Sequence, residues 1–247
     1  IALIGPYDVF IVVAVFSALS SISAMLINTV EHRGDGVSET GSLLRDTALG
    51  IKTISQTPAV LLGMSFVLTL AMVYLPTEMV VLPAHFNEIN YATGLGILIS
   101  TMAGASVFGA LLFERLQMAF KYSTILKMGF IGLGLSVLVM SFLPPMPIML
   151  MAGAVLGFSW GPLMPMLNTV IQRVIPESMR GRVFGIEMTI WSAGPMLTAV
   201  AVGIAVDGVG VQPVYLLLAS IVLALSVFVS FNKANIKLDL AQSAAAL

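Results

Sequence analysis

The chain contains no cysteine and has few histidines and few charges, and each shortage excludes a class of function. Zero cysteines exclude disulfides, thiolate metal sites and a cysteine nucleophile. The two histidines, His32 and His85, lie far apart in the sequence, so a histidine-based metal site is not expected. A formal net charge of −1 at pH 7 gives no electrostatic basis for binding nucleic acid.

The scarcity of charge also indicates the medium in which the chain folds. Only 9% of its 247 residues are charged and 58% are hydrophobic, whereas soluble domains usually carry about 25% charged residues. A chain this apolar cannot cover itself with polar surface, so we expect the lipid bilayer to be its main partner. The first residue is Ile1, and no basic segment precedes the first apolar run, so no signal peptide is visible and a missing natural start is expected.

Seven apolar runs are long enough to cross a bilayer core of about 30 Å, which needs about 20 residues per helix. The uncharged stretch 128–172 is too long for one helix, and the prolines of "PPMP" (144–147) divide it because proline ends a helix. The sequence therefore predicts an all-α membrane protein with seven transmembrane helices. The predicted spans are Val9–Val30, Pro58–Ala84, Ala92–Phe113, Thr124–Leu143, Ile148–Ile171, Val183–Val206 and Val214–Phe231.

All eleven lysines and arginines lie in alternate connections. Three follow the first span, three the third, three the fifth, and two are in the tail, whereas "HFNEINY", "PPMP" and "DGVGVQP" contain none. Because cytoplasmic loops are enriched in basic residues, these loops and the C-terminus are predicted to be cytoplasmic. The predicted organisation is a lone helix (1–30), a cytoplasmic linker with an amphipathic helix (31–57), a six-helix bundle (58–232) and a cytoplasmic tail (233–247).

The linker contains "SLLRDTALGIKTIS" (42–55), which predicts an amphipathic helix resting on the inner membrane surface. Ser42 can cap it. The residues expected on its apolar face are Leu44, Ala48, Ile51 and Ile54.

Two features of the bundle indicate how its helices are arranged. Its first helix contains "YLPTEMVVLP" (74–83) and its fourth "WGPLMPMLN" (160–168), each with paired prolines, and its second and fifth helices are both rich in small residues. Three helices followed by three similar ones is an arrangement found in secondary transporters. Glycines 153, 157 and 161, and Ala105 with Gly109, recur every four residues, which predicts close approach of helix backbones.

Ionisable groups inside spans are costly and tend to be functional. Glu78, two residues after Pro76, could bind a proton or a cationic substrate, or could occupy a wet position at the outer mouth. Glu187 is expected to pair with an arginine of the nearby cytoplasmic loop. Polar, aromatic and adaptable methionine side chains could line a substrate path or could serve ordinary helix packing. These candidates are Trp160, Asn168, Trp191, Met164 and Met196.

An enzymatic interpretation is not favoured. "GFSWG" (157–161) matches the G-x-S-x-G nucleophile motif, but it lies within a long apolar helix and lacks the strand–turn–helix context. No histidine lies at membrane depth to serve as its base. The last span has no lysine for a retinal Schiff base.

One stretch, "NTVIQRVIPESMRGRVFGIEM" (168–188), resembles the span-10 to span-11 connection of the major facilitator superfamily. There the pattern P-x-x-x-R-G-R-V-(F/Y)-G falls on Pro176 and residues 180–185. Residues 81–112 resemble spans seven and eight of its drug- and siderophore-exporter branches. The resemblance covers nearly the whole chain. It implies a sixth span, the central loop and a C-terminal six-helix bundle of the major-facilitator fold, with five earlier spans missing.

The resemblance also implies functional residues and a mechanism. Its signature loop recurs between spans eight and nine as "GALLFERLQMAFKYS" (109–123), with Glu114 and Arg115 one place late and no second glycine. The implied cytoplasmic gating residues are Glu114, Arg115, Arg180, Arg182 and Glu187.

The implied function is proton-coupled efflux of a small amphipathic compound across a bacterial inner membrane, by alternating access against the missing N-terminal half. It needs no cofactor and no covalent chemistry. The alternatives are a facilitator or importer without proton coupling, and a non-transporting half or scaffold.

Overall fold

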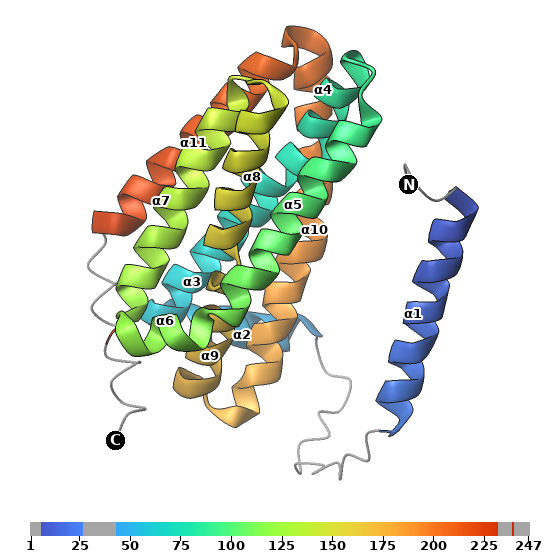
Figure 1. The fold of residues 1–247 in the computed structure, drawn as a ribbon. Coiled ribbons are helices and arrows are strands. Elements are labelled where there is room, and N and C mark those ends of the chain that lie inside the picture. Colours follow the sequence, from blue (N-terminus) through green and yellow to red (C-terminus); the bar gives the residue numbers. More distant parts are fainter. Residues whose placement is uncertain (1–5, 27–42, 232–238, 240–247) are drawn as a thin grey trace. The chain divides into compact units, whose positions relative to one another are not determined.

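The computed structural model describes residues 6–26, 43–231 and 239, and all regular structure within them is helical (Figure 1). The chain divides into two units, Ile1–Leu43 and Leu44–Leu247. The first unit contains α1 (Pro6–Leu26). Its described apolar stretch, Val13–Ser23, is shorter than a full membrane crossing, and residues 27–30 of the predicted first span lie outside the described residues.

The second unit contains six helical spans of membrane length, and they confirm the six predicted after the linker. Two further helices, α2 (Leu43–Gln56) and α6 (Phe113–Ala119), are not spans. The first span consists of α3 (Pro58–Thr69), η1 (Leu70–Tyr74), η2 (Thr77–Val81) and α4 (Leu82–Glu88). The others are α5 (Ala92–Leu111), α7 (Tyr122–Ser141), α8 (Met146–Trp160) with α9 (Leu163–Val174), α10 (Glu177–Val209) and α11 (Val211–Phe231).

The two spans with paired prolines are both interrupted. In the first, η1 and η2 are π-helical turns on either side of Pro76, with hydrogen bonds from the Leu75 N–H to the Leu70 carbonyl and from the Leu82 N–H to the Thr77 carbonyl. The fourth breaks between α8 and α9, at Gly161 and Pro162. Proline removes a backbone donor and clashes with the preceding turn, which explains both interruptions.

The glycines of α8 allow its backbone to touch that of α5, as the sequence predicted. A Cβ on Gly157 would collide with the backbone carbonyl of Met102, and one on Gly161 with that of Ser106. From α5, a Cβ on Gly109 would collide with the Phe158 carbonyl. Without a hydrophobic force between helices in lipid, such close approach is how these two helices gain dispersion contacts.

The connections separate into two sets at opposite ends of the bundle (Figure 1). At one end lie α2, α6 and the α9–α10 turn, and at the other lie the α4–α5, α7–α8 and α10–α11 turns. Every described lysine and arginine belongs to the first set or to the nearby start of α7. These residues are Arg45, Lys52, Arg115, Lys121, Lys127, Arg173, Arg180 and Arg182.

The side through which helix α2 packs against the bundle matches the predicted apolar face at Ile54 but not at Ile51. Gly50 and Ile54 are buried, and a Cβ on Gly50 would lie 2.6 Å from the Ile186 side chain of α10. The Asp46 carboxylate, one turn before Gly50, forms an ion pair with Arg182 (3.0 Å). Ile51, expected on the apolar face, is exposed. Helix α2 therefore packs against α10 through the side that contains Gly50, its smallest residue, because a glycine permits the closest approach of the two helices.

Candidate functional site

A cavity of about 210 Å³ lies between the interrupted first span, α5 and α8, and we call it the Glu78 cavity. Glu78 supplies the carboxylate of its lining, and the remaining lining residues are mostly apolar. Ligand sites combine an apolar wall with a few polar groups in the same way, but they are usually larger, about 300–1,000 Å³. The lining residues are Tyr74, Leu75, Glu78, Ile99, Met102, Ala103, Ser106, Leu156, Gly157 and Trp160.

The Glu78 side chain is held by Tyr74, whose hydroxyl donates a hydrogen bond to Glu78 Oε1. Tyr74 ends η1 and Glu78 lies in η2, so the pair brackets Pro76. The Thr77 hydroxyl donates to the Tyr74 carbonyl (2.6 Å). A side chain therefore provides a hydrogen bond to the backbone in this interrupted segment of the span. π-helical turns occur frequently at functional sites, and here they set the position of the one pair of polar side chains that bond within the cavity wall.

Three aromatic rings from different spans form a continuous row beside the cavity. The Tyr74 and Trp160 ring centroids are 5.6 Å apart, and Trp160 and Trp191 are also 5.6 Å apart with the rings inclined by 68°. Such tilted and edge-to-face pairs add about 0.5–1.5 kcal/mol beyond area burial. We call Tyr74, Trp160 and Trp191 the aromatic row.

A carboxyl group lies at each end of the aromatic row. Glu78 bonds to Tyr74 at one end. At the other, Glu187 is buried on α10 one turn before Trp191, so the two side chains share a side of that helix. The row therefore connects the two acids that the sequence identified inside spans, through aromatic surfaces that can contact apolar or cationic groups.

The residues predicted to line a substrate path do not all lie together. Glu78 and Trp160 line the cavity, and Trp191 joins them through the aromatic row. Met164 and Asn168 lie half-buried on α9, beyond the break in the fourth span, and neither lines the cavity. Met196 is 74% exposed on α10. Two of the six predicted pathway residues line the cavity, because the rotation of each helix decides which side chains reach it.

The predicted gating residues do not share one environment. Glu114 and Arg115 are exposed on α6 and form no ion pair with any described residue. Arg180 donates to the Ile175 carbonyl (3.0 Å), which holds the α9–α10 turn.

The predicted pair between Glu187 and a loop arginine is not formed among the described residues. Arg182 binds Asp46 of α2 instead, with its Nε 3.1 Å and its Nη2 3.0 Å from Oδ1. Glu187 lies five positions after Arg182, so the two side chains leave α10 on different sides, whereas residues three or four positions apart share a side.

Several members of the site were not predicted from the sequence. Tyr74 could have been found, because it stands four residues before Glu78 and so shares its helix face. Met102, Ser106 and the Asp46 partner of Arg182 carry no local signal, because their roles depend on contacts between distant segments.

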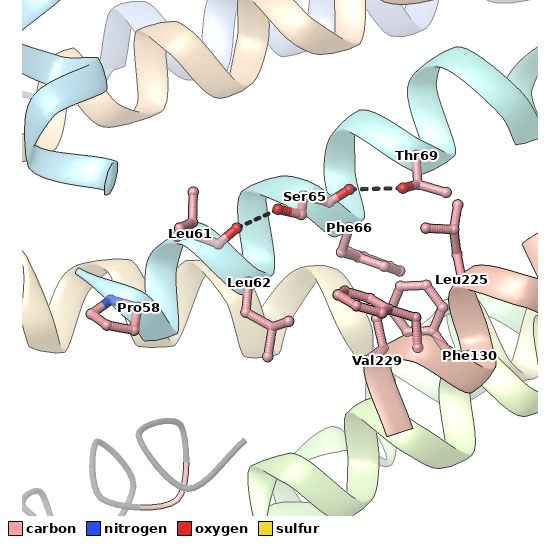
Figure 2. A pocket seen from close by; sticks show the side chains of 10 residues that line it. Pro58, Leu61, Leu62, Ser65, Phe66, Thr69, Phe130, Leu225 and Val229 are labelled. Carbon is pink, nitrogen blue, oxygen red and sulfur yellow. Dashed lines mark hydrogen bonds between the residues drawn. The ribbon is translucent and has the colours of Figure 1, made fainter. Parts of the chain in front are cut away.

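A larger cavity of about 360 Å³ lies between α3, α7 and α11, away from Glu78 (Figure 2). Its two hydroxyls are already bonded along their own helix: Ser65 donates to the Leu61 carbonyl (2.8 Å) and Thr69 to the Ser65 carbonyl (2.9 Å). It offers apolar surface without a charged group. The lining residues are Pro58, Leu61, Leu62, Ser65, Phe66, Thr69, Phe130, Leu225, Phe228 and Val229.

Comparison with known proteins identifies relatives of most of the chain. The model of the Major Facilitator Superfamily matches residues 79–237. The chain is similar to the "Multidrug efflux pump Tap" of Mycolicibacterium fortuitum, with 30% identity over 225 residues, covering 89% of this chain and 54% of that protein. The protein of the same name from Mycobacterium tuberculosis (strain ATCC 25618 / H37Rv) is 33% identical over 153 residues, covering 62% of this chain and 36% of the relative.

The chain thus spans about half the length of the first relative and about a third of the second. No solved structure matches it significantly.

Proposed function

Because this chain belongs to the major facilitator superfamily, we propose that it forms the C-terminal part of an exporter in a bacterial inner membrane. The exporter moves a small amphipathic compound outward and uses the proton gradient. The relatives named multidrug efflux pumps support export, and the mainly apolar wall of the Glu78 cavity supports an amphipathic substrate.

The observation that carries the proposal is the placement of the Glu78 carboxyl group in a cavity inside a span. A carboxylate at membrane depth is costly and is found mainly on ion and substrate pathways. Glu78 is half-buried, and among the described residues its carboxyl group is bonded by the Tyr74 hydroxyl rather than by a cation. It can therefore take up a proton when the cavity is open to the acidic side, and release it when the cavity opens to the other side.

The aromatic row supports substrate binding beside this proton site. Tyr74 belongs both to the row and to the bond with Glu78, so a compound lying against Trp160 would be close to the carboxyl group. Proton uptake removes the negative charge that a cationic or polar group of the substrate would contact. If a proton and the substrate compete for one carboxyl group, binding of one releases the other, and this exchange produces antiport.

Alternating access further requires a second half against which this bundle can move. Helices α5 and α10 are the spans that the rest of the bundle covers least. In each, 22% of the residues of the most apolar stretch are buried, compared with 39–56% in the other four spans. We propose that an N-terminal half of the full-length transporter covers these two helices, and that the substrate binds between the two halves. Large exposed side chains on the two helices are Val107, Phe108, Met196, Leu197, Val200 and Ile204.

The orientation follows from the end at which the basic residues gather. Cytoplasmic loops carry an excess of Lys and Arg, and all described basic residues lie toward one end of the bundle. We therefore place α2, α6 and the α9–α10 turn in the cytoplasm, with the C-terminus on the same side.

A transport assay tests the role of Glu78. The full-length protein, reconstituted in proteoliposomes, would be given several dyes with and without a pH gradient, as wild type, Glu78→Gln and Glu88→Gln. Glu88 is an exposed acid of the same span, so its variant is a matched control. We expect Glu78→Gln to lose the acceleration that the gradient gives and Glu88→Gln to keep it. Gradient-dependent transport by Glu78→Gln would contradict the proposal, and wild-type, gradient-independent rates in both would favour a facilitator.

A further inference from the structure

One wall of the Glu78 cavity belongs to α5, a span that the rest of the bundle covers little. From this helix Ile99, Ala103 and Ser106 line the cavity together with Met102. Ile99, Ala103 and Ser106 are four and three positions apart, so they share one side of α5. Ile99 and Ala103 are exposed and Ser106 is half-buried, whereas Met102 is buried. The cavity therefore opens to the outside of the bundle along the line of these three residues.

The other walls of the cavity carry its carboxyl group and its aromatic rings. Glu78 and Tyr74 come from the interrupted first span, and Trp160 comes from α8. In the proposed function, the second half of the transporter covers α5, and the substrate lies between the halves. A compound that contacts Trp160 and the Glu78 carboxyl group must then lie against the exposed side of α5.

Close packing against α8 holds α5 in position. A Cβ on Gly157 would collide with the Met102 carbonyl, and a Cβ on Gly161 would collide with the Ser106 carbonyl. These contacts join backbone to backbone, and moving the helices apart would lose the dispersion contacts that hold them together in lipid. The width of the cavity at α5 therefore depends on the side chains of this helix.

Ala103 leaves the most room at the opening of the cavity. Among the lining residues only Gly157 is smaller, and Gly157 is buried against α5. Ala103 lies between Ile99 and Ser106 on the exposed side, so a longer side chain at position 103 would extend across the opening. The cavity volume is about 210 Å³, so even a few added atoms would fill a substantial part of it.

We propose that Ala103 is a specificity-determining residue that sets the largest ring system able to enter the Glu78 cavity. This inference rests on the proposed function and names the substrate chemistry: a cationic amine or quaternary ammonium group attached to a flat ring system. The cation is placed at the Glu78 carboxylate and the ring against Trp160, whose face attracts cations and stacks on flat rings. A larger residue at position 103 excludes the largest rings first.

Binding of a graded series of ligands to the full-length protein tests this assignment. The series is benzyltrimethylammonium, (naphthylmethyl)trimethylammonium and (anthracenylmethyl)trimethylammonium, which share one cationic group and differ in the number of fused rings. Calorimetric titration in detergent would measure each Kd for the wild type, Ala103→Leu and Ala103→Ser. The matched control is Ala224→Leu, which changes an exposed alanine of α11 that does not line the cavity.

We expect Ala103→Leu to raise the Kd of the anthracenyl ligand about tenfold and that of the benzyl ligand less than about twofold, because only the larger ring fills the opening. Ala103→Ser adds a single oxygen atom and should keep the wild-type Kd values. Ala224→Leu should keep them as well. Ala103 is exposed, and unchanged thermal unfolding of each variant would establish that it folds.

Four results would overturn the assignment of Ala103. They are wild-type Kd values in Ala103→Leu, an equal rise for all three ligands, the same size-dependent loss in Ala224→Leu, and no binding of any ligand by the wild type. The second would mean that the substitution damages the site without setting a size limit. Because the readout is binding, it is independent of the transport assay above: a failure of gradient-dependent transport contradicts the proposed function, whereas a size-dependent change in Kd still identifies Ala103 as the residue that limits ligand size.

Discussion

At the scale of single residues, we expect a buried hydroxyl to stabilise this bundle only where it forms a hydrogen bond to another helix. The Ser226 hydroxyl of α11 lies 2.8 Å from the Phe130 carbonyl of α7 and 2.8 Å from the Val222 carbonyl of its own helix, and the first of these contacts joins two spans. Ser136 of α7 is equally buried, but its hydroxyl has no hydrogen-bond partner among the described residues. The two serines therefore form a natural pair for comparison.

We expect Ser226→Ala to lower the free energy of unfolding by about 0.5–1 kcal/mol, because interhelical hydrogen bonds in membrane proteins contribute about that much. Ser136→Ala should be neutral or slightly stabilising, since it removes a buried hydroxyl that bonds to nothing. Chemical unfolding of the full-length protein in detergent measures both. A loss of equal size in the two variants would mean that the interhelical bond is not the cause.

Residue identity predicted part of the candidate site. Charge in an otherwise apolar span identified Glu78 and Glu187, and aromatic character identified Trp160 and Trp191. In the structure the two tryptophans belong to the aromatic row, Glu78 bonds to its Tyr74, and Glu187 lies one turn before Trp191 on α10. Residue type could not tell them from Met196, which is exposed, because a helix in lipid is apolar on both its inner and its outer side.

At the scale of elements, the glycines of α8 explain why this helix lies so close to α5. Gly157 faces the backbone of α5 rather than a movable side chain, so an added methyl group has no room. Interrupted helices can shift more easily than continuous ones, and α8 ends at such an interruption. Its close contact with α5 then holds one wall of the Glu78 cavity in place, since Met102 and Gly157 both line it.

We predict that Gly157→Ala lowers the free energy of unfolding by about 1–3 kcal/mol, the usual cost of overpacking. Gly208→Ala on α10 is the control, because nothing lies within 4 Å of a Cβ at that position. The control should be neutral or slightly stabilising. Thermal unfolding of the two variants measures the difference, and a stable Gly157→Ala variant would mean that α5 and α8 can move apart at little cost.

Helix α2 shows the limits of an amphipathic pattern. Its sequence predicted an apolar face containing Ile51, but the face in contact with α10 runs through Asp46 and Gly50. Both partners of the Asp46–Arg182 pair are about one-third exposed, so the pair determines position more than stability. It leaves Ile51 and Leu49 uncovered, available to the membrane surface.

At the scale of the whole molecule, exposed apolar side chains have two different surroundings. Met151 on α8 and Leu197 on α10 are almost equally exposed, at 71% and 72%. Met151 lies on a well-covered span and on its lipid-facing stripe, whereas Leu197 lies on one of the two least covered spans. Our proposal assigns Leu197 to the contact with a second half of the transporter.

We therefore expect Leu197→Trp to reduce transport strongly, because a large ring there would obstruct the movement of the two halves. Met151→Trp should transport normally, since lipid can accommodate the ring. Dye transport by both variants in proteoliposomes, with thermal unfolding to establish that they fold, measures the difference. Normal transport by Leu197→Trp would argue against placing the second half on this face of α10.

The sequence by itself determined the number and approximate positions of the six spans and the end at which the basic residues gather, whereas helix ends differ by up to six residues. These follow from local chemistry: a span must be apolar over about 20 residues and must satisfy its own backbone hydrogen bonds. The paired prolines also marked the two spans that are interrupted, because proline acts on its own helix.

Only the tertiary structure decided which sides of the helices meet. It placed Trp160 between Tyr74 and Trp191, and it paired Arg182 with Asp46 rather than with Glu187. In water, an alternation of polar and apolar residues would have marked the inner side of each helix. In lipid both sides are apolar, so the rotation of each span depends on close packing between segments distant in the sequence.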